Sequence, residues 1–196
     1  MAKIFFVTGK SCSGKDTIFR VLKENKELNL KTVVGYTTRP MRDGEKDGSE
    51  YFFVDEVKLK ELKNEGKVIE CRAYNTVHGV WNYFTVNDGQ IELNNHNYIY
   101  IGTLESYEQF VKYYGKDMVI PIYVEVENGE RLERAIKRER QQKTPKYEEL
   151  CRRFLADEKD FSEENICKAG IEKRYVNNDL DDCIEEIINE IRKKSV

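Results

Sequence analysis

Short apolar runs alternate with segments of helical periodicity along this chain. Residues 4–7, 33–36, 98–101 and 119–126 are largely apolar at consecutive positions, which is typical of strands buried on both faces. Segments with helical spacing separate these runs. The alternation predicts an α/β fold in which flanking helices cover a parallel sheet.

Two later segments carry an apolar stripe at helical spacing. The first has apolar or aromatic residues at positions 107, 110, 111 and 114, and Gly115 follows as a helix stop. The second has isoleucines at positions 184, 187, 188 and 191, with Lys193 and Lys194 near its end, where cations suit the helix dipole. Both stripes predict helices that pack on the sheet.

Two polar insertions interrupt this core. Residues 39–48 are rich in turn-forming and charged residues, and residues 51–54 form a short aromatic strand. A helix over 55–66 follows, with Asp55 as its cap and Gly66 as its stop, and an extended strand resumes over 67–71. This pattern predicts a small inserted subdomain over about residues 36–95.

The second insertion spans residues 131–153. Arg131, Arg134 and Arg138 share one helical face, and Pro145 interrupts any continuous helix, so this insertion predicts a helical lid of two arms that close over an anion. The 196 residues suit a single domain, with its core formed by residues 1–35, 96–130 and 154–196.

Composition narrows the class of protein. Lys and Arg total 33 against 36 Asp and Glu, so the net charge of −3 provides no global cationic field for binding nucleic acid. The five cysteines contain no Cys-x-x-Cys pair, which favours a reducing cytoplasm over a disulfide framework or a zinc site. No stretch approaches a transmembrane length, so we expect a cytoplasmic protein without a membrane partner.

The segment Thr-Gly-Lys-Ser-Cys-Ser-Gly-Lys-Asp-Thr, residues 8–17, has the spacing of a P-loop directly after a strand. Gly9 and Gly14 allow turns in which successive backbone N–H groups face phosphate oxygens at a helix N-terminus. Lys15 supplies a mobile charge for the terminal phosphates. We therefore expect ATP to contact the residues of this loop, namely Gly9, Lys10, Ser11, Cys12, Ser13, Gly14, Lys15, Asp16 and Thr17.

One position of this loop departs from the usual P-loop pattern. Asp16 follows Lys15 where a Ser or Thr hydroxyl commonly serves magnesium, and Thr17 comes one place later. Asp16 either binds Mg²⁺ directly or through water, while Thr17 supports the helix, or it only complements the helix dipole. Asp16 and Thr17 are thus the candidate Mg²⁺ ligands.

Further motifs join this loop. They are the segments 36–42 (Tyr-Thr-Thr-Arg-Pro-Met-Arg), 44–54 (Gly-Glu-Lys-Asp-Gly-Ser-Glu-Tyr-Phe-Phe-Val), 68–70, 152–153 and 175–180. Together with the P-loop they resemble the guanylate kinase family over nearly the whole chain. The resemblance implies transfer of the γ-phosphate of ATP, with Mg²⁺, to a small phosphorylated acceptor, a nucleoside monophosphate such as GMP or dGMP.

The resemblance also implies roles for residues of the acceptor site. Arg39, Arg42 and Tyr51 match the family positions that grip the monophosphate, and guanidinium forks suit phosphate oxygens. Glu70 matches the carboxylate that accepts hydrogen bonds from the donor edge of guanine.

Three acceptor positions depart from the family. His78-Gly79-Val80 stands where the family usually has Tyr-Gly-Ser, with His78 as a substitute phosphate donor or an incidental loop residue. Gly35 replaces a common serine, and Thr103 stands where a guanine-binding aspartate is expected. Thr103 still accepts one hydrogen bond but carries no charge, so it would bind guanine more weakly than the aspartate.

Phosphoryl transfer depends on positioning and charge neutralisation, so cations are the expected catalysts. These are Lys15, Arg39, Arg138 and Arg153, with Arg140 as an alternative to Arg138. The resemblance places Asn177 beside the adenine of ATP, and the alternative is a turn residue.

Two rival functions remain at this point. A P-loop with Asp after Lys also looks like that of ribose bisphosphate phosphokinases, for which ribose 1,5-bisphosphate would be the acceptor. The other rival is a non-catalytic guanylate-kinase-like binding module, although such modules generally lose the working P-loop. Both a monomer and a homodimer are compatible with the sequence.

Overall fold

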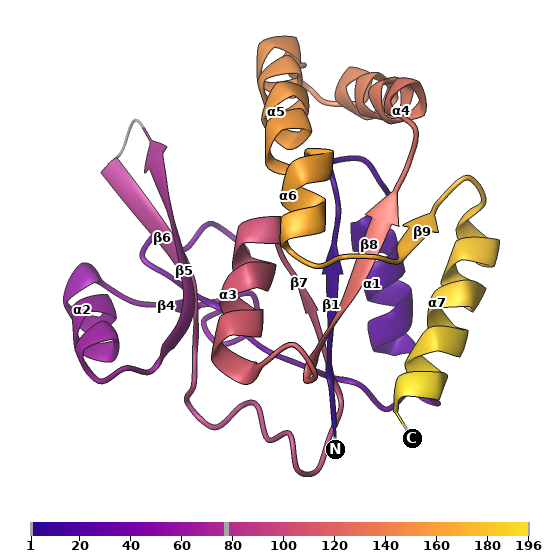
Figure 1. The fold of residues 1–196 in the computed structure, drawn as a ribbon. Helices are drawn as coiled ribbons and strands as arrows, with labels where there is room; N and C mark the ends of the chain where they lie inside the picture. The colour runs from indigo at the N-terminus through magenta and orange to yellow at the C-terminus, as the bar shows by residue number, and fades with distance from the viewer. Residues whose placement is uncertain (1, 77–78, 196) are drawn as a thin grey trace.

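The computed structural model describes residues 2–76 and 79–195, which build two sheets and the helices around them (Figure 1). In the central sheet, β1 (Ile4–Thr8) lies between β7 (Tyr98–Ile101) and β8 (Val119–Glu125). The edge strands are β2 (Lys31–Thr32) and β9 (Arg174–Val176). All four pairings are parallel, which confirms the predicted fold class.

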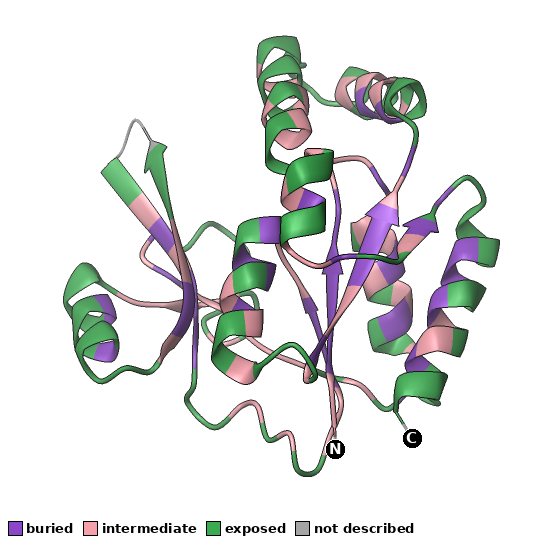
Figure 2. Cartoon of the chain, viewed as in Figure 1, coloured by how far each residue is buried: buried purple, intermediate pink, exposed green. Residues whose placement is uncertain are grey.

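Helices cover both faces of this sheet. On one face, α1 (Lys15–Glu24) and α7 (Leu180–Lys194) pack on Phe5 and Val7 of β1. On the other, α3 (Leu104–Tyr114) and α6 (Glu163–Lys168) pack around Phe6. Both faces of β1 are therefore buried (Figure 2), which explains why its sequence is continuously apolar.

The second sheet forms the predicted insertion and stands beside the core (Figure 1). Its order is β4 (Phe52–Phe53), β3 (Tyr36–Thr37), β6 (Gly79–Val86) and β5 (Val68–Thr76). Helix α2 (Glu56–Asn64) packs Leu59 and Leu62 on one face of this sheet, against Phe84 and Val86. Asp55 caps α2 as predicted, because its carboxylate accepts from the Lys58 N–H at 2.7 Å.

The prediction of one strand over residues 33–36 was wrong. The chain leaves the central sheet after Thr32, and Tyr36 already pairs with Phe84 of the second sheet. Between them, the backbone of Val34 forms two hydrogen bonds with the side-chain amide of Gln90. The apolar run crosses from one sheet to the other, and apolarity alone does not distinguish a crossing from a strand.

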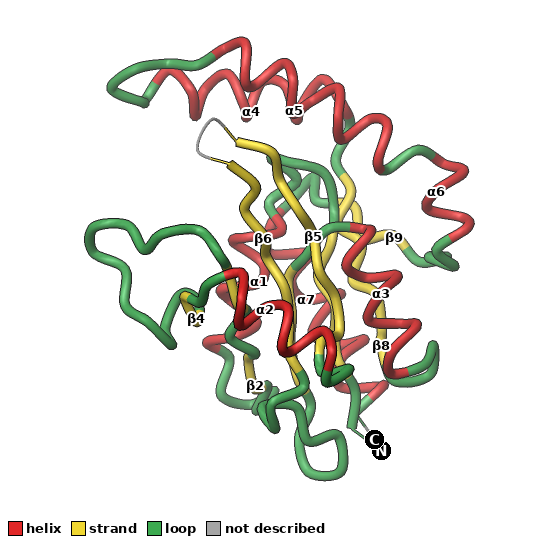
Figure 3. Tube along the Cα trace, turned by 90° about the vertical axis from the view of Figure 1, so that its left-hand side faces the viewer, coloured by secondary structure: helices red, strands yellow, loops and turns green. Residues whose placement is uncertain are grey.

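The lid consists of α4 (Asn128–Arg140) and α5 (Tyr147–Asp160), with Pro145 in the connection between them. Figure 1 shows these helices at the end of the molecule toward which the arrows of β1 and β8 point, and Figure 3 shows α4 and α5 at the same end from the side. In parallel α/β sheets, ligands bind at this carboxyl end of the strands. Within the described residues, no helix is long and apolar enough to cross a membrane.

Ile187 of α7 is fully buried against the central sheet, whereas its neighbour Ile188 is only partly buried. We expect Ile187→Ala to lower the free energy of unfolding by about 2 to 5 kcal/mol, since it removes buried methyl groups and leaves a cavity. Ile188→Ala is the matched control and should cost clearly less. Urea unfolding followed by circular dichroism measures both, and equal losses would contradict this packing.

Candidate active site

The P-loop joins β1 to α1 and depends on its two glycines. Gly14 has φ 88° directly before the first residue of α1. A Cβ atom there would lie 2.2 Å from Asn177 Nδ2, and one at Gly9 would lie 2.4 Å from the carbonyl oxygen of Val124. Both positions therefore exclude a side chain, which fits the close backbone approach predicted for this loop.

Asn177 forms a buried hydrogen bond with the backbone of the P-loop. Its side chain is buried, and Nδ2 donates to the carbonyl oxygen of Ser13 at 2.8 Å. The carbonyl oxygen of Asn177 in turn accepts from Arg134 Nη2 of the lid at 3.2 Å. The sequence predicted a position beside adenine, but the structure buries the amide of Asn177 against the loop, where it holds the loop in shape.

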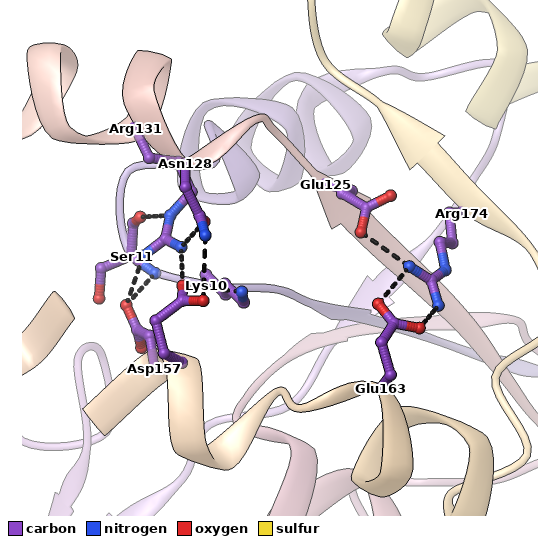
Figure 4. Close-up of polar contacts among 9 residues, drawn as sticks. Lys10, Ser11, Glu125, Asn128, Arg131, Asp157, Glu163 and Arg174 are labelled. Atoms are coloured by element: carbon purple, nitrogen blue, oxygen red, sulfur yellow. Dashed lines mark hydrogen bonds and ion pairs between the residues drawn. The ribbon is translucent and has the colours of Figure 1, made fainter. Parts of the chain in front are cut away.

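Arg131 of α4 is the centre of a buried polar cluster between the P-loop and the lid (Figure 4). Its guanidinium, only 1% exposed, donates to the carbonyl oxygen of Ser11 at 3.1 Å and to Glu158 at 2.8 Å. Asp157 completes the cluster, since it lies 3.3 Å from Arg131 Nη2 and accepts from the Ser11 N–H at 2.7 Å. Sequence reasoning grouped Arg131 with the other lid arginines and missed this role.

Lys10 belongs to the same cluster, because its Nζ lies 2.8 Å from Glu158. Lys10, Arg131 and Asn128 all donate to Glu158, and although burial opposes them, they lower the pKa of its carboxyl. One backbone N–H and one lysine of the predicted phosphate cradle are thus already bonded to carboxylates of α5.

A cavity of about 490 Å³ lies between the P-loop and the lid, and the predicted arginines Arg138 and Arg153 both line it, together with Ser11 and Cys12. Arg140 lies on the other side of α4, so Arg138 is the better placed of the two alternatives. Arg153 Nε lies 2.7 Å from Glu149, and hydrogen bonds from Arg152 and Arg153 lower the pKa of this glutamate to about 2.

The predicted monophosphate residues Arg39 and Tyr51 lie together in the insertion. The Arg39 guanidinium stands 5.6 Å from the Tyr51 ring centre, and its side chain is 4% exposed. Its fork is occupied by Glu45, with N–O distances of 2.7 and 2.5 Å. This ion pair lowers the pKa of Glu45 to about 2, so the pair stays charged at any physiological pH. The side chain of Arg42 is exposed.

The carboxylate of Glu70 is buried in this structure. Its side chain has no exposed area and pairs with Arg72, whose Nε lies 3.0 Å from Oε2. The hydroxyl of Thr85 donates to Oε1 at 2.9 Å, and that of Tyr100 at 3.3 Å. In this structure Glu70 is enclosed and Arg72 covers it, and its assignment as a guanine acceptor stays a prediction.

The other acceptor positions named from the sequence are Thr103, Val80, Gly35 and His78. Thr103 caps α3, since its hydroxyl accepts from the Ser106 N–H at 3.2 Å. Val80 is half exposed, and a Cβ at Gly35 would come within 3.6 Å of the Tyr51 ring. His78 lies outside the described residues, so its role stays a prediction.

A second cavity, of about 570 Å³, joins the P-loop to the insertion. Lys15 and Asp16 line one side, and Arg72 and Thr103 line the other. The Asp16 carboxylate is 81% exposed and lies 3.2 Å from Lys15 Nζ. No group of three metal-ligating side chains gathers among the described residues, so Asp16 and Thr17 would need phosphate oxygens to complete a magnesium site.

A P-loop at the carboxyl end of a parallel sheet, together with an inserted sheet and a pair of helices over the loop, defines a P-loop α/β protein. The family model for guanylate kinase matches residues 1–194. The chain therefore belongs to the guanylate kinase family.

Curated relatives support this membership over part of the chain. Guanylate kinase from Nitrosomonas europaea is 37% identical over 79 residues, which cover 40% of this chain and 37% of the relative. Guanylate kinase from Mycoplasma pneumoniae is 33% identical over 95 residues, or 48% of this chain and 38% of the relative. The chain thus aligns with well under half the length of these relatives.

A solved structure extends the likeness of fold to the whole chain. Guanylate kinase from Anaplasma phagocytophilum has a TM-score of 0.63 and 22% sequence identity, covering 100% of this chain and 87% of that one. This neighbour confirms the α/β architecture.

The Asn177 anchor gives a direct test of the P-loop geometry. Asn177→Ala should lower the free energy of unfolding by about 1 to 3 kcal/mol, because the buried carbonyl of Ser13 loses its donor. It should also weaken the binding of ATP with Mg²⁺, measured by isothermal titration calorimetry. Asn178→Ala, at the exposed neighbouring residue, is the control. Unchanged ATP affinity in the Asn177 variant would show that the loop holds its shape without this bond.

Proposed function

We propose that the protein transfers the γ-phosphate of ATP to a nucleoside monophosphate, GMP or dGMP, to give the diphosphate. The observation that carries this proposal is the cavity that joins the P-loop, through Lys15 and Asp16, to Arg72 and Thr103 of the acceptor side. ATP phosphates bound beside Lys15 and an acceptor bound beside Arg72 and Thr103 would share this cavity. Such in-line positioning is the main requirement of phosphoryl transfer.

On the donor side, Lys15 would neutralise the terminal phosphates of ATP. Arg138 and Arg153 reach the neighbouring lid cavity from α4 and α5, so closure of the lid would bring them to the transferred group. The exposed carboxylate of Asp16, with Thr17, would hold Mg²⁺, which would supply charge neutralisation for the transferred phosphoryl group.

On the acceptor side, Arg39, Arg42 and Tyr51 would hold the monophosphate. Arg39 is already oriented by Glu45, so an arriving phosphate would take the place of that carboxylate on a fork of fixed geometry. A preformed fork loses little side-chain freedom on binding.

Family membership supports this function over the two alternatives. Family membership does not favour a sugar-phosphate kinase, and the retained P-loop, in which Gly9 and Gly14 leave no room for a side chain, supports a donor site over a platform for peptides.

The first test is ATP-dependent phosphorylation of GMP, dGMP, AMP, CMP, UMP, dTMP and ribose 1,5-bisphosphate by the purified protein. We expect turnover of GMP or dGMP that falls by about a hundredfold or more in Lys15→Ala, because one preorganised cation at the transition state has effects of this size. Turnover of ribose 1,5-bisphosphate alone, or none that depends on Lys15, would refute the proposal.

The lid arginines give a matched pair for a second test. Arg152 and Arg153 both pair with Glu149, but only Arg153 lines the lid cavity. Arg153→Met should lower kcat for GMP by about tenfold to a thousandfold, whereas Arg152→Met should stay within about threefold of the unaltered protein. Steady-state kinetics at saturating ATP measure both, and equal effects would mean that Arg153 acts only through the lid fold.

A further inference from the structure

Two connections of the chain join the inserted sheet to the core. Residues 33–35 lead from β2 of the central sheet to β3 of the inserted sheet, and residues 87–97 lead from β6 back to β7. At the core end, the Lys31 N–H donates to the carbonyl oxygen of Asn97 at 2.9 Å. At the opposite end, β3 and β6 pair as antiparallel strands. The position of the inserted sheet therefore depends on how these two connections are held between their ends.

The side chain of Gln90 links the two connections between these ends. Its Oε1 accepts from the Val34 N–H at 2.9 Å, and its Nε2 donates to the carbonyl oxygen of Val34 at 3.2 Å. A side-chain amide offers a donor and an acceptor as a peptide group does, so Gln90 pairs with Val34 much as a neighbouring strand would. One amide thus satisfies both polar groups of the Val34 backbone, where the chain leaves the central sheet.

Asp88 fixes the orientation of this amide. Its Oδ1 accepts from the Gln90 backbone N–H at 3.1 Å, and its Oδ2 accepts from Gln90 Nε2 at 2.8 Å. The amide nitrogen has two N–H groups, and Asp88 and Val34 accept one each, so the amide cannot flip without losing both bonds.

The hydroxyl of Tyr36 completes the arrangement, because it donates to Asp88 Oδ2 at 2.7 Å. Burial, together with this hydrogen bond, raises the pKa of Tyr36, so its hydroxyl remains a donor at physiological pH. Tyr36, Asp88 and Gln90 thus form one hydrogen-bonded unit, the crossing clamp.

The crossing clamp holds the segment next to Tyr51. Directly after Val34, the carbonyl oxygen of Gly35 accepts from the Phe52 N–H at 2.8 Å. The ring of Tyr36 packs on that of Phe52, with ring centres 4.8 Å apart. Tyr51 precedes Phe52 in the chain, so its place in the monophosphate site depends on these contacts.

The same strand leads to Arg39. Thr37 of β3 is fully buried, and its hydroxyl accepts from the Arg39 N–H at 3.2 Å and donates to the carbonyl oxygen of Asn82 at 2.9 Å. The Arg39 guanidinium in turn lies 5.6 Å from the ring centre of Tyr51. Both residues predicted to grip the monophosphate therefore take their position from β3, and the crossing clamp holds the start of β3.

Gln90 would act indirectly. The described residues that line the cavity beside the P-loop do not include it. A binding site whose parts are held in place before the ligand arrives loses less conformational freedom on binding, so a residue that only fixes the backbone still contributes to affinity.

We propose that Gln90, oriented by Asp88 and Tyr36, is a positioning residue of the acceptor site. It fixes the start of β3 and so holds Arg39 and Tyr51 where the monophosphate binds, without touching the acceptor itself. This inference rests on the proposed function, because it concerns the acceptor of that same reaction.

Gln90→Met keeps the length of the side chain and removes the amide. We expect KM for GMP to rise by about fivefold to twentyfold, because two hydrogen bonds to Val34 are lost and the site must be ordered on binding. The values of kcat and of KM for ATP should stay within about threefold. Steady-state kinetics with each substrate varied in turn measure all three.

A merely structural role would give a different result. Less folded protein would lower kcat and leave KM for GMP unchanged, and that outcome would overturn the proposal. An equal rise of KM for GMP and for ATP would overturn it as well. Asn94→Ala, at an exposed residue of the same connection, is the control and should leave KM for GMP unchanged.

Tyr36→Phe tests whether the crossing clamp acts as one unit. It removes the hydroxyl and keeps the ring on Phe52, so alone it should raise KM for GMP by about twofold to fivefold. Combined with Gln90→Met it should add less than about twofold, because residues of one hydrogen-bond network are not additive. Fully additive effects would overturn the assignment of Tyr36 and Gln90 to one unit.

Hydrogen exchange at the Val34 amide separates this inference from the proposed function, since it needs no substrate. Gln90→Met should speed this exchange by about tenfold or more, whereas Asn94→Ala should not. Faster exchange in a protein without Lys15-dependent turnover of any nucleoside monophosphate would refute the proposed function, and with it the acceptor role of Gln90, while the clamp itself would stand. Turnover of GMP with an unchanged KM in Gln90→Met would keep the proposed function and refute the role of Gln90.

Discussion

The buried guanidinium of Arg131 ties the phosphate loop to the lid. It donates to a carbonyl of the loop and to carboxylates of α5, and it does so with 1% exposure, so its charge is satisfied entirely by the protein. A buried charge that lost a partner would cost several kcal/mol, so loop, α4 and α5 are held as one unit. Because α4 and α5 are held in this way, their arginines Arg138 and Arg153 line the cavity beside the phosphate loop.

Two arginines of the insertion are likewise paired with a carboxylate. Glu45 holds the fork of Arg39, and Glu70 holds Arg72, so two cations of the inserted sheet have an internal counter-ion and a fixed orientation before a ligand arrives. The two pairs differ in access. The side chain of Glu45 is 18% exposed, whereas that of Glu70 has no exposed area. In the proposed function, a phosphate would replace Glu45 on Arg39, whereas Arg72 would keep Glu70 as its partner.

The sequence predicted what depends on local pattern and missed what depends on distant pairing. The P-loop, the Asp55 cap, the closing helix and the break at Pro145 each follow from a short run of residues, and each was confirmed. Residues 33–36 look like a strand but cross between sheets. The contacts of Asn177 with Ser13 and of Arg131 with Asp157 join residues far apart in the chain, and no local pattern carries such pairings.

The hydrogen bond from the Ser11 N–H to Asp157 has a consequence for how the loop behaves without a nucleotide. A carboxylate there resembles a phosphate oxygen in charge and geometry, so it serves as an internal placeholder. In the proposed function, nucleotide arrival would exchange one anion for another at Ser11, and departure would return the loop to this hydrogen-bonded state. Such a competition would lower nucleotide affinity, and it would keep the Ser11 N–H hydrogen-bonded both before and after a nucleotide is bound.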